Sequence, residues 1–172
     1  MSDWSLRLAR PDDAEKMPAI EAAAGQLFAS DPDLAKLDIF DDGWEPHELR
    51  KLIRRGHCLV SHIGEDMAGF LIAEPHKREL HIWEMDVHPR FQRRGIGAGL
   101  LRACQIDARN SGFRALTLTT FRDLAWNAPF YTGLGFVEAD PESHPRLAEY
   151  LAEEAEDGLP AERRCAMIHF LD

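Results

Sequence analysis

Along this chain, apolar residues alternate with polar ones in some segments and recur every three or four positions in others. Alternation is typical of a half-buried strand, and the longer spacing is typical of an amphipathic helix. Alternation or a short β-rich run predicts strands at residues 4–9, 58–63, 67–74, 79–87, 115–121 and 165–171, with another beginning at Gly133. Helical spacing predicts helices at residues 14–29, 45–55, 95–110, 125–132 and 145–157.

The order of these elements predicts an α/β (α+β) fold, with a mixed, mostly antiparallel sheet of six to seven strands flanked by helices. Residues 58–87 hold three strands joined by short turns, which is typical of an antiparallel meander. If the helix that follows is a crossover, the strand at 115–121 runs parallel to the strand at 79–87. Since no linker or repeat interrupts this order, we expect a single domain over residues 1–172.

The chain has 172 residues and a formal net charge of −10 at pH 7. Proteins that bind nucleic acid need a basic face, so we expect no nucleic-acid partner. The sequence has no apolar run long enough to cross a membrane and does not begin like a signal peptide, so we expect no membrane association. Three scattered cysteines are too few for a disulfide framework, which favours a reducing, cytoplasmic location.

Against this acidic background, a basic and glycine-containing loop follows the strand at 79–87. Gln92, Arg93 and Arg94 come directly before Gly95-Ile96-Gly97, where the next helix is expected to open. Glycines let the backbone approach an anion without a Cβ in the way, and the free N–H groups at a helix start favour negative charge. The loop therefore predicts a phosphate-binding site.

Other ligand-binding motifs fit this sequence less well. It contains no Walker loop, G-x-x-x-x-G-K-[ST]. A dinucleotide-binding fingerprint, G-x-G-x-x-G, would need glycine or alanine where Leu100 stands, and it would need a tighter turn between Val87 and Gly95. The cysteines and histidines show neither C-x-x-C nor H-E-x-x-H spacing, and we expect no metal.

Three segments together carry a resemblance to a known family. MDVHP leads into QRRGIG, the strand ALTLTTF follows the helix, and WNAPFYTGLGF forms the next helix–strand unit. QRRGIG also matches the Q/R-x-x-G-x-G/A loop that binds the pyrophosphate of coenzyme A. In this order and spacing, the chain resembles the Gcn5-related N-acetyltransferases (GNAT). The resemblance implies a sheet that is splayed between two parallel strands, the ones at 79–87 and 115–121.

The resemblance also implies how acetyl-CoA is held as co-substrate. The pantetheine arm lies in the gap between the parallel strands, beside Met85, Asp86 and Val87, and takes backbone hydrogen bonds from Met85 and Val87. Asn127 matches a position whose side chain contacts the coenzyme. The pyrophosphate lies on the loop and helix start, which consist of Gln92, Arg93, Arg94, Gly95, Ile96 and Gly97, and Arg93 or Arg94 adds charge.

Two residues are candidates for the chemistry. Tyr131 matches the family tyrosine that protonates the leaving thiolate, and it lies one helical turn after Asn127. A tyrosine pKa of about 10 exceeds a thiol pKa of about 8.5, so hydrogen-bond stabilisation of the thiolate is an alternative to full proton transfer. Glu84 is the candidate base, because a carboxylate in the middle of a strand is disfavoured unless it has a function or an ion-pair partner. A structural ion pair explains the position of Glu84 equally well. Asp86 is a weaker candidate on the same face.

The acceptor is expected to be a primary amine, either a small amine or a basic side chain, attacked directly in a ternary complex. Dimers are common in the family, which leaves a homodimer open. A non-catalytic acyl-CoA-sensing module on the same fold is the alternative function. A cationic acceptor is favoured by an acidic stretch in the region that walls the family's acceptor cleft, although a solvated loop explains that stretch equally well. Its aspartates are Asp31, Asp33, Asp38, Asp41 and Asp42.

Overall fold

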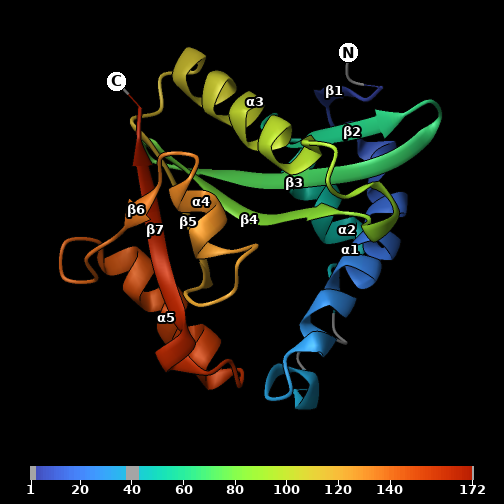
Figure 1. Ribbon diagram of the computed structural model, residues 1–172. Coiled ribbons are helices and arrows are strands. Elements are labelled where there is room, and N and C mark those ends of the chain that lie inside the picture. Colours follow the sequence, from blue (N-terminus) through green and yellow to red (C-terminus); the bar gives the residue numbers. More distant parts are fainter. Residues whose placement is uncertain (1–2, 38–42, 172) are drawn as a thin grey trace.

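The computed structural model describes residues 3–37 and 43–171. Within these residues, seven strands form one sheet in the order β1-β2-β3-β4-β5-β7-β6 (Figure 1). The strands are β1 (Ser5–Leu8), β2 (Leu59–Ile63), β3 (Asp66–His76), β4 (Glu79–Val87), β5 (Ala115–Phe121), β6 (Val137–Glu138) and β7 (Arg164–Phe170). The α-helices are α1 (Met17–Gly25), α2 (Pro46–Ile53), α3 (Ile96–Asn110), α4 (Ala128–Thr132) and α5 (Pro145–Glu156).

The predicted meander and the predicted parallel pair are both confirmed. β2, β3 and β4 pair antiparallel, and α3 connects β4 to β5, which pair parallel. The sequence did not indicate the order at the other edge, where the last strand β7 lies between β5 and β6 and pairs antiparallel with both. β6 is only two residues long, so β7 provides most of the support for β5 on that side.

The prediction of one continuous helix over residues 14–29 is wrong. The structure divides it into a 3₁₀ segment, η1 (Pro11–Lys16), the helix α1, and a second 3₁₀ segment, η2 (Gln26–Ser30). Pro18 stands in the first turn of α1, where its missing N–H has no helical partner to lose. Pro129 is tolerated in α4 for the same reason, since α4 begins at Ala128 rather than at the predicted residue 125.

Helices cover both faces of the sheet. On one face, α3 buries Leu100, Leu101 and Cys104 against the strands, and α4 contributes Ala128 to the same cluster. On the other face, α1 and α2 pack on β2 and β3, and α5 packs on β5 and β7. In the described part of the chain, no helix has both the length and the apolar character needed to span a bilayer.

The parallel pairing of β4 with β5 is short. It joins Glu79–His81 to Ala115–Thr117, and no further pairs follow in the described residues. Figure 1 shows β1–β4 on one side and β5, β7 and β6 on the other, diverging from the end where β4 and β5 pair. The edge of β4 from Ile82 to Val87 therefore has no strand partner on its β5 side.

A β-bulge at Trp83 determines which way the second half of β4 faces. Ile72 of β3 pairs with Glu84, and the adjacent Ala73 pairs with Ile82, so Trp83 is the extra residue. The bulge reverses which alternate side chains of β4 face α3. Before it, the apolar residues that face α3 are Leu80 and Ile82; after it, they are Met85 and Val87. Without it, strict alternation would direct Glu84 and Asp86 into the core beneath α3.

Candidate active site

The divergence of β4 and β5 opens a cavity of about 990 Å³. The helix α1, the loop before α3, and α4 complete its walls, so segments distant in the sequence share one space. All but one of the predicted site residues line this cavity: Glu84, Met85, Asp86, Val87, Gln92, Arg93, Gly95, Ile96, Gly97, Asn127 and Tyr131. The exception is Arg94.

The loop before α3 has the backbone geometry of an anion-binding turn. Arg93 has φ 65° and Gly95 has φ 83°, so two residues of the left-handed region flank Arg94. This region is uncommon for a residue with a Cβ, so the backbone of Arg93 is locally strained and must be kept in this conformation by the surrounding structure. Gly95 is the N-cap of α3 and has no side-chain cap, so the first N–H groups of the 15-residue helix remain available to a ligand.

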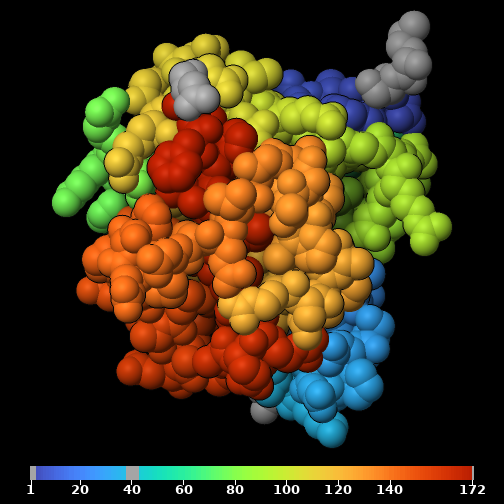
Figure 2. All heavy atoms as spheres, turned by 60° about the vertical axis from the view of Figure 1, so that its left-hand side comes forward, coloured from blue at the N-terminus to red at the C-terminus, as the bar shows by residue number. Residues whose placement is uncertain are grey.

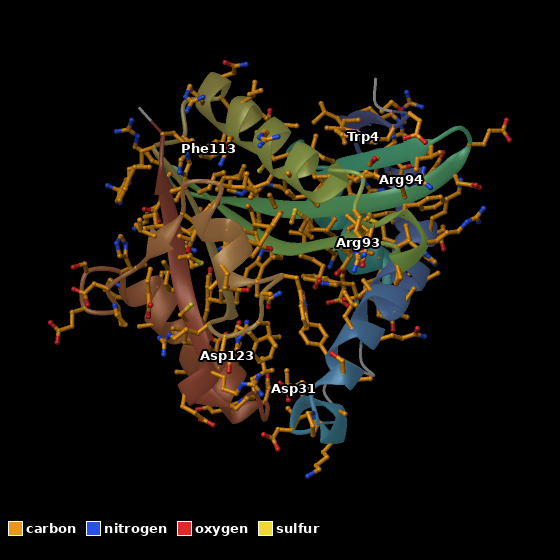
Figure 3. All side chains as sticks on the ribbon, in the orientation of Figure 1. Trp4, Asp31, Arg93, Arg94, Phe113 and Asp123 are labelled. Atoms are coloured by element: carbon orange, nitrogen blue, oxygen red, sulfur yellow. The ribbon has the colours of Figure 1, made fainter. Side chains whose placement is uncertain are left out.

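Arg93 and Arg94 lie differently, although they are adjacent (Figure 3). Arg93 lines the cavity. The guanidinium of Arg94 instead donates a hydrogen bond to Asp3 Oδ2 at 2.8 Å, and it lies 5.8 Å from the centre of the Phe91 ring. Of the two arginines, Arg93 is therefore placed to meet an anion in the cavity.

Trp4 ties the loop to the first strand. Its indole Nε1 donates a hydrogen bond to the carbonyl oxygen of Arg94 at 2.9 Å. The same ring lies against α3 at Gly99, where an added Cβ would come within 2.4 Å of Trp4 Cη2. A larger residue at position 99 would therefore force Trp4 to shift.

Three carboxylates meet on the face of the cavity that α1 covers. Glu84 and Asp86 come from β4 after the bulge, and Glu21 comes from α1; one oxygen from each lies within 4.8 Å of the others. Trp44 connects two of them, because its backbone N–H donates to Glu21 Oε1 at 2.8 Å and its indole Nε1 donates to Glu84 Oε2 at 3.3 Å. We call Glu21, Glu84 and Asp86 the carboxylate cluster.

The cluster resists carrying three negative charges. Burial and then the charge of Glu84 raise the pKa of Glu21 to about 7. Burial and the same neighbour hold the pKa of Asp86 well above its usual range. In the described part of the chain, Asp86 Oδ2 is buried without a hydrogen-bond partner, and no lysine or arginine forms an ion pair with any of the three. The alternative of a structural ion pair for Glu84 therefore finds no support among the described residues.

Tyr131 lies on the opposite wall, on α4. Its ring packs between Phe130 and Phe136, with centroid distances of 5.4 Å and 5.7 Å. Burial, with smaller contributions from the charges of Glu84 and Asp86, raises the pKa of Tyr131 above its ordinary value. The hydroxyl therefore stays protonated over the neutral range, and it is a weak acid and a good hydrogen-bond donor.

Asn127 stands at the start of α4 and supports the end of β5. Its Oδ1 accepts a hydrogen bond from the backbone N–H of Phe121 at 3.3 Å. Its backbone carbonyl accepts a hydrogen bond from the N–H of Tyr131 at 3.0 Å. Asn127 thus connects the free end of β5 to the helix that carries Tyr131.

Arg163 joins the two arms of the molecule beyond the cavity. Its guanidinium donates to Asp31 at 2.7 Å and to Asp123 at 2.9 Å. The hydrogen bond from Arg163, helped by the backbone N–H of Leu34, lowers the pKa of Asp31 to about 2. Figure 3 shows Asp31 and Asp123 on opposite arms, and Figure 2 shows the light-blue segment near Asp31 against the red-orange segment near Arg163. We call this the Arg163 bridge.

The Arg163 bridge changes the interpretation of the acidic stretch. Asp31 pairs with Arg163, and neither Asp31 nor Asp33 lines the cavity. Asp38, Asp41 and Asp42 lie outside the described residues. The carboxylates that face the cavity include Glu21, which the sequence reasoning missed together with Trp44, and the two residues of β4.

The fold and the cavity identify the class of the protein. The model of the acetyltransferase (GNAT) family matches residues 25–136 of the chain. The chain belongs to this family, and it is an acyltransferase of the acetyltransferase class.

Solved structures agree on the fold. The chain is similar to the PaiA N-acetyltransferase of Thermoplasma acidophilum, solved in complex with coenzyme A, with 14% identity, a TM-score of 0.74 and 99% coverage of both chains. It is also similar to the ribosomal-protein-S18-alanine N-acetyltransferase of Escherichia coli, with 17% identity, a TM-score of 0.70, and coverage of 98% of this chain and 94% of the other. Ard1 of Thermoplasma volcanium matches at 19% identity and a TM-score of 0.69 over 99% of both chains.

Proposed function

We propose that this protein transfers the acetyl group of acetyl-CoA to a primary amine, either a small amine or a basic side chain, by direct attack in a ternary complex. One observation carries this proposal. A single cavity contains an anion-binding helix start, an unpaired strand edge, and the Glu84 and Tyr131 side chains. In the proposal, residues 1–172 act as one domain.

The chain has the groups that acetyl-CoA requires. The N–H groups of Gln92–Gly97 and the guanidinium of Arg93 would hold the pyrophosphate. The unpaired edge of β4, with Met85, Asp86 and Val87, would bind the amide groups of pantetheine as an additional strand does. Asn127 lines the same passage and would contact the arm from the α4 side.

The proposed reaction begins with the amine nitrogen. Glu84 accepts a proton from the bound ammonium, and the nitrogen lone pair attacks the thioester carbonyl carbon. As the C–N bond forms, the C–S bond breaks and the thiolate leaves toward Tyr131. The phenol donates a hydrogen bond or its proton to the sulfur. The nitrogen loses its second proton to the thiolate, or to the phenolate if Tyr131 has given up its own, which yields an acetamide and free coenzyme A.

The raised pKa of Tyr131 bears on the last step. A phenol that is a weaker acid than usual transfers its proton to a thiolate only against a larger free-energy difference. Hydrogen-bond stabilisation of the developing thiolate is therefore the larger part of the role that we propose for Tyr131.

The proposal fits a reducing compartment such as the cytoplasm. Cys58, Cys104 and Cys165 are all free thiols, and all three are buried. Reduced thiols are the usual state of cysteines in that compartment.

An acceptor screen with detection of thiol release tests the proposal. The purified chain with acetyl-CoA should release coenzyme A only when a primary amine from a panel of polyamines, aminoglycosides, amino acids and peptide N-termini is present. Acetyl-CoA should also raise the melting temperature, and NAD should not. A melting shift with acetyl-CoA but no turnover on the whole panel would instead support the sensing module.

A further inference from the structure

The cavity is strongly acidic on the side of the carboxylate cluster. Glu21, Glu84 and Asp86 converge there from two elements, α1 and β4. Of the cationic side chains in the described chain, the cavity is lined by Arg93, which lies at the phosphate loop, and by Arg164. Arg164 is already engaged, because it donates hydrogen bonds to Glu154 at 3.2 Å and 3.1 Å. Among the described residues, the cluster therefore has no cationic side chain as a partner.

Asp86 gives a second observation that points to a ligand. Its Oδ2 atom is buried and has no hydrogen-bond donor among the described residues. A buried acceptor without a donor is destabilising, and such groups in folded proteins are usually satisfied by a ligand, a proton or water. An ammonium group supplies three N–H donors and a positive charge, which suits three converging carboxylates.

The surroundings of the cluster also favour an organic cation. Trp44 fixes Glu21 and Glu84 through two N–H donors, so the carboxylates are oriented before a ligand arrives. Trp44 and Trp83 also line the cavity, as do Phe28 and Trp126, whose ring centres lie 6.3 Å apart. Aromatic faces attract ammonium groups and accept the methylene chain that carries them.

From these observations we infer that Glu21, Glu84 and Asp86 together form the binding site for the ammonium form of the acceptor. The acceptor class is therefore a cationic alkylamine, and repulsion disfavours an amine that also carries a free carboxylate. Glu21 is a specificity-determining residue, because it adds charge to the site from α1 and takes no part in the bond changes. This inference rests on the proposed function and narrows its acceptor.

Three probes of equal carbon number test the charge preference. They are 1,4-diaminobutane, butylamine and 4-aminobutanoate, offered to the enzyme with saturating acetyl-CoA while thiol release is followed. The diamine and the monoamine should be acetylated, with kcat/KM at least about tenfold above that of the amino acid, which corresponds to about 1.4 kcal/mol. Equal kcat/KM for 4-aminobutanoate and butylamine would overturn the inference.

A matched pair of variants tests the role of Glu21. Glu21→Gln and Glu149→Gln make the same chemical change, but Glu149 is exposed on α5 and does not line the cavity. Calorimetry with the complex of enzyme and free coenzyme A, which cannot turn over, should show a Kd for 1,4-diaminobutane at least about tenfold higher in Glu21→Gln. Glu149→Gln should stay within about twofold, and both variants should bind coenzyme A like the wild type. An unchanged diamine Kd in Glu21→Gln contradicts the inference.

Two further outcomes separate the inference from its competitors. Three carboxylate oxygens within 4.8 Å of one another could instead hold a divalent cation. A melting shift with Ca²⁺ or Mg²⁺ that Glu21→Gln abolishes, with diamine binding intact, would identify a metal site and overturn the ammonium site. If coenzyme A itself does not bind, the proposed function fails; if it binds but the three probes are used equally, only the inference fails.

Discussion

Trp4 donates a hydrogen bond from its indole Nε1 to the carbonyl oxygen of Arg94 at 2.9 Å, across 90 positions of sequence. The ring of Trp4 also contacts Gly99 in the first turn of α3. The residue just before β1 thus holds both the loop and the helix start that we propose as the pyrophosphate site. Trp4 does not itself line the cavity, so it acts as a positioning residue.

Trp4→Phe should weaken coenzyme A binding without slowing the chemical step. Phenylalanine keeps an aromatic ring near Gly99 but cannot donate to the Arg94 carbonyl, and one hydrogen bond contributes about 0.5–1.5 kcal/mol. We expect a rise of about threefold to tenfold in the Kd for coenzyme A, measured by calorimetry, with kcat unchanged at saturating acetyl-CoA. Asp3→Asn is the control, because it removes only the exposed ion pair with Arg94 and such pairs contribute little. Equal losses in both variants would contradict the role of Trp4.

Arg93→Gln and Arg94→Gln should differ in their effect on coenzyme A affinity. Arg93 lines the cavity, whereas Arg94 turns toward Asp3 and Phe91. Loss of a charged contact to phosphate should raise the Kd by about tenfold for Arg93→Gln, and the difference should shrink at high salt. For Arg94→Gln we expect less than about a threefold change. Binding curves at two salt concentrations decide, and a larger loss for Arg94→Gln would reverse the assignment.

Tyr131→Phe should lower turnover while coenzyme A affinity is maintained. Phenylalanine preserves the packing against Phe130 and Phe136 but has no hydroxyl to donate to the thiolate. We expect kcat to fall by about 10²-fold, the lower range for loss of a general acid. The Kd for coenzyme A should stay within about twofold, since the phenol acts on the leaving sulfur. A variant with wild-type kcat would remove Tyr131 from the mechanism.

Glu21→Gln should stabilise the unliganded protein at neutral pH, although it weakens amine binding. Burial raises the pKa of Glu21 from 4.5 to about 7, so the folded state holds a proton that the unfolded state releases. The free energy of unfolding of the wild type therefore falls as pH rises from about 4.5 to about 7. Below that window both states are protonated, and above it both are ionised. The melting temperature of Glu21→Gln relative to the wild type should rise through the window and then stay constant. A constant difference from pH 4 to pH 8 would contradict it.

The strongest local patterns predicted their elements well. β4 and β5 have the predicted bounds, and α3 begins one residue after the predicted start, because alternation and glycine punctuation act within a few residues. The bulge at Trp83 and the insertion of β7 between β5 and β6 depend on pairing between distant strands, which a single sequence does not reveal. The contiguous motif QRRGIG predicted the phosphate-binding loop. The fold was needed to show that Arg93 faces the cavity and Arg94 does not.

Glu21 could have been recognised as a candidate site residue from its position in the sequence. Met17 and Ala24 are buried on α1, and Glu21 lies four positions after the first and three positions before the second. A glutamate on the apolar stripe of a helix is as informative as a carboxylate in mid-strand. Its convergence with Glu84 could not be predicted, because it depends on the bulge and on the placement of Trp44.

The Arg163 bridge has a consequence for the order in which the protein folds. Asp31 and Arg163 are 132 positions apart, so their contact closes a loop that spans most of the chain. Closing such a loop is entropically unfavourable until nearer contacts have shortened the path between its ends. We therefore expect the arm beyond α1 that carries Asp31 to dock against Arg163 only after β7 has joined the sheet.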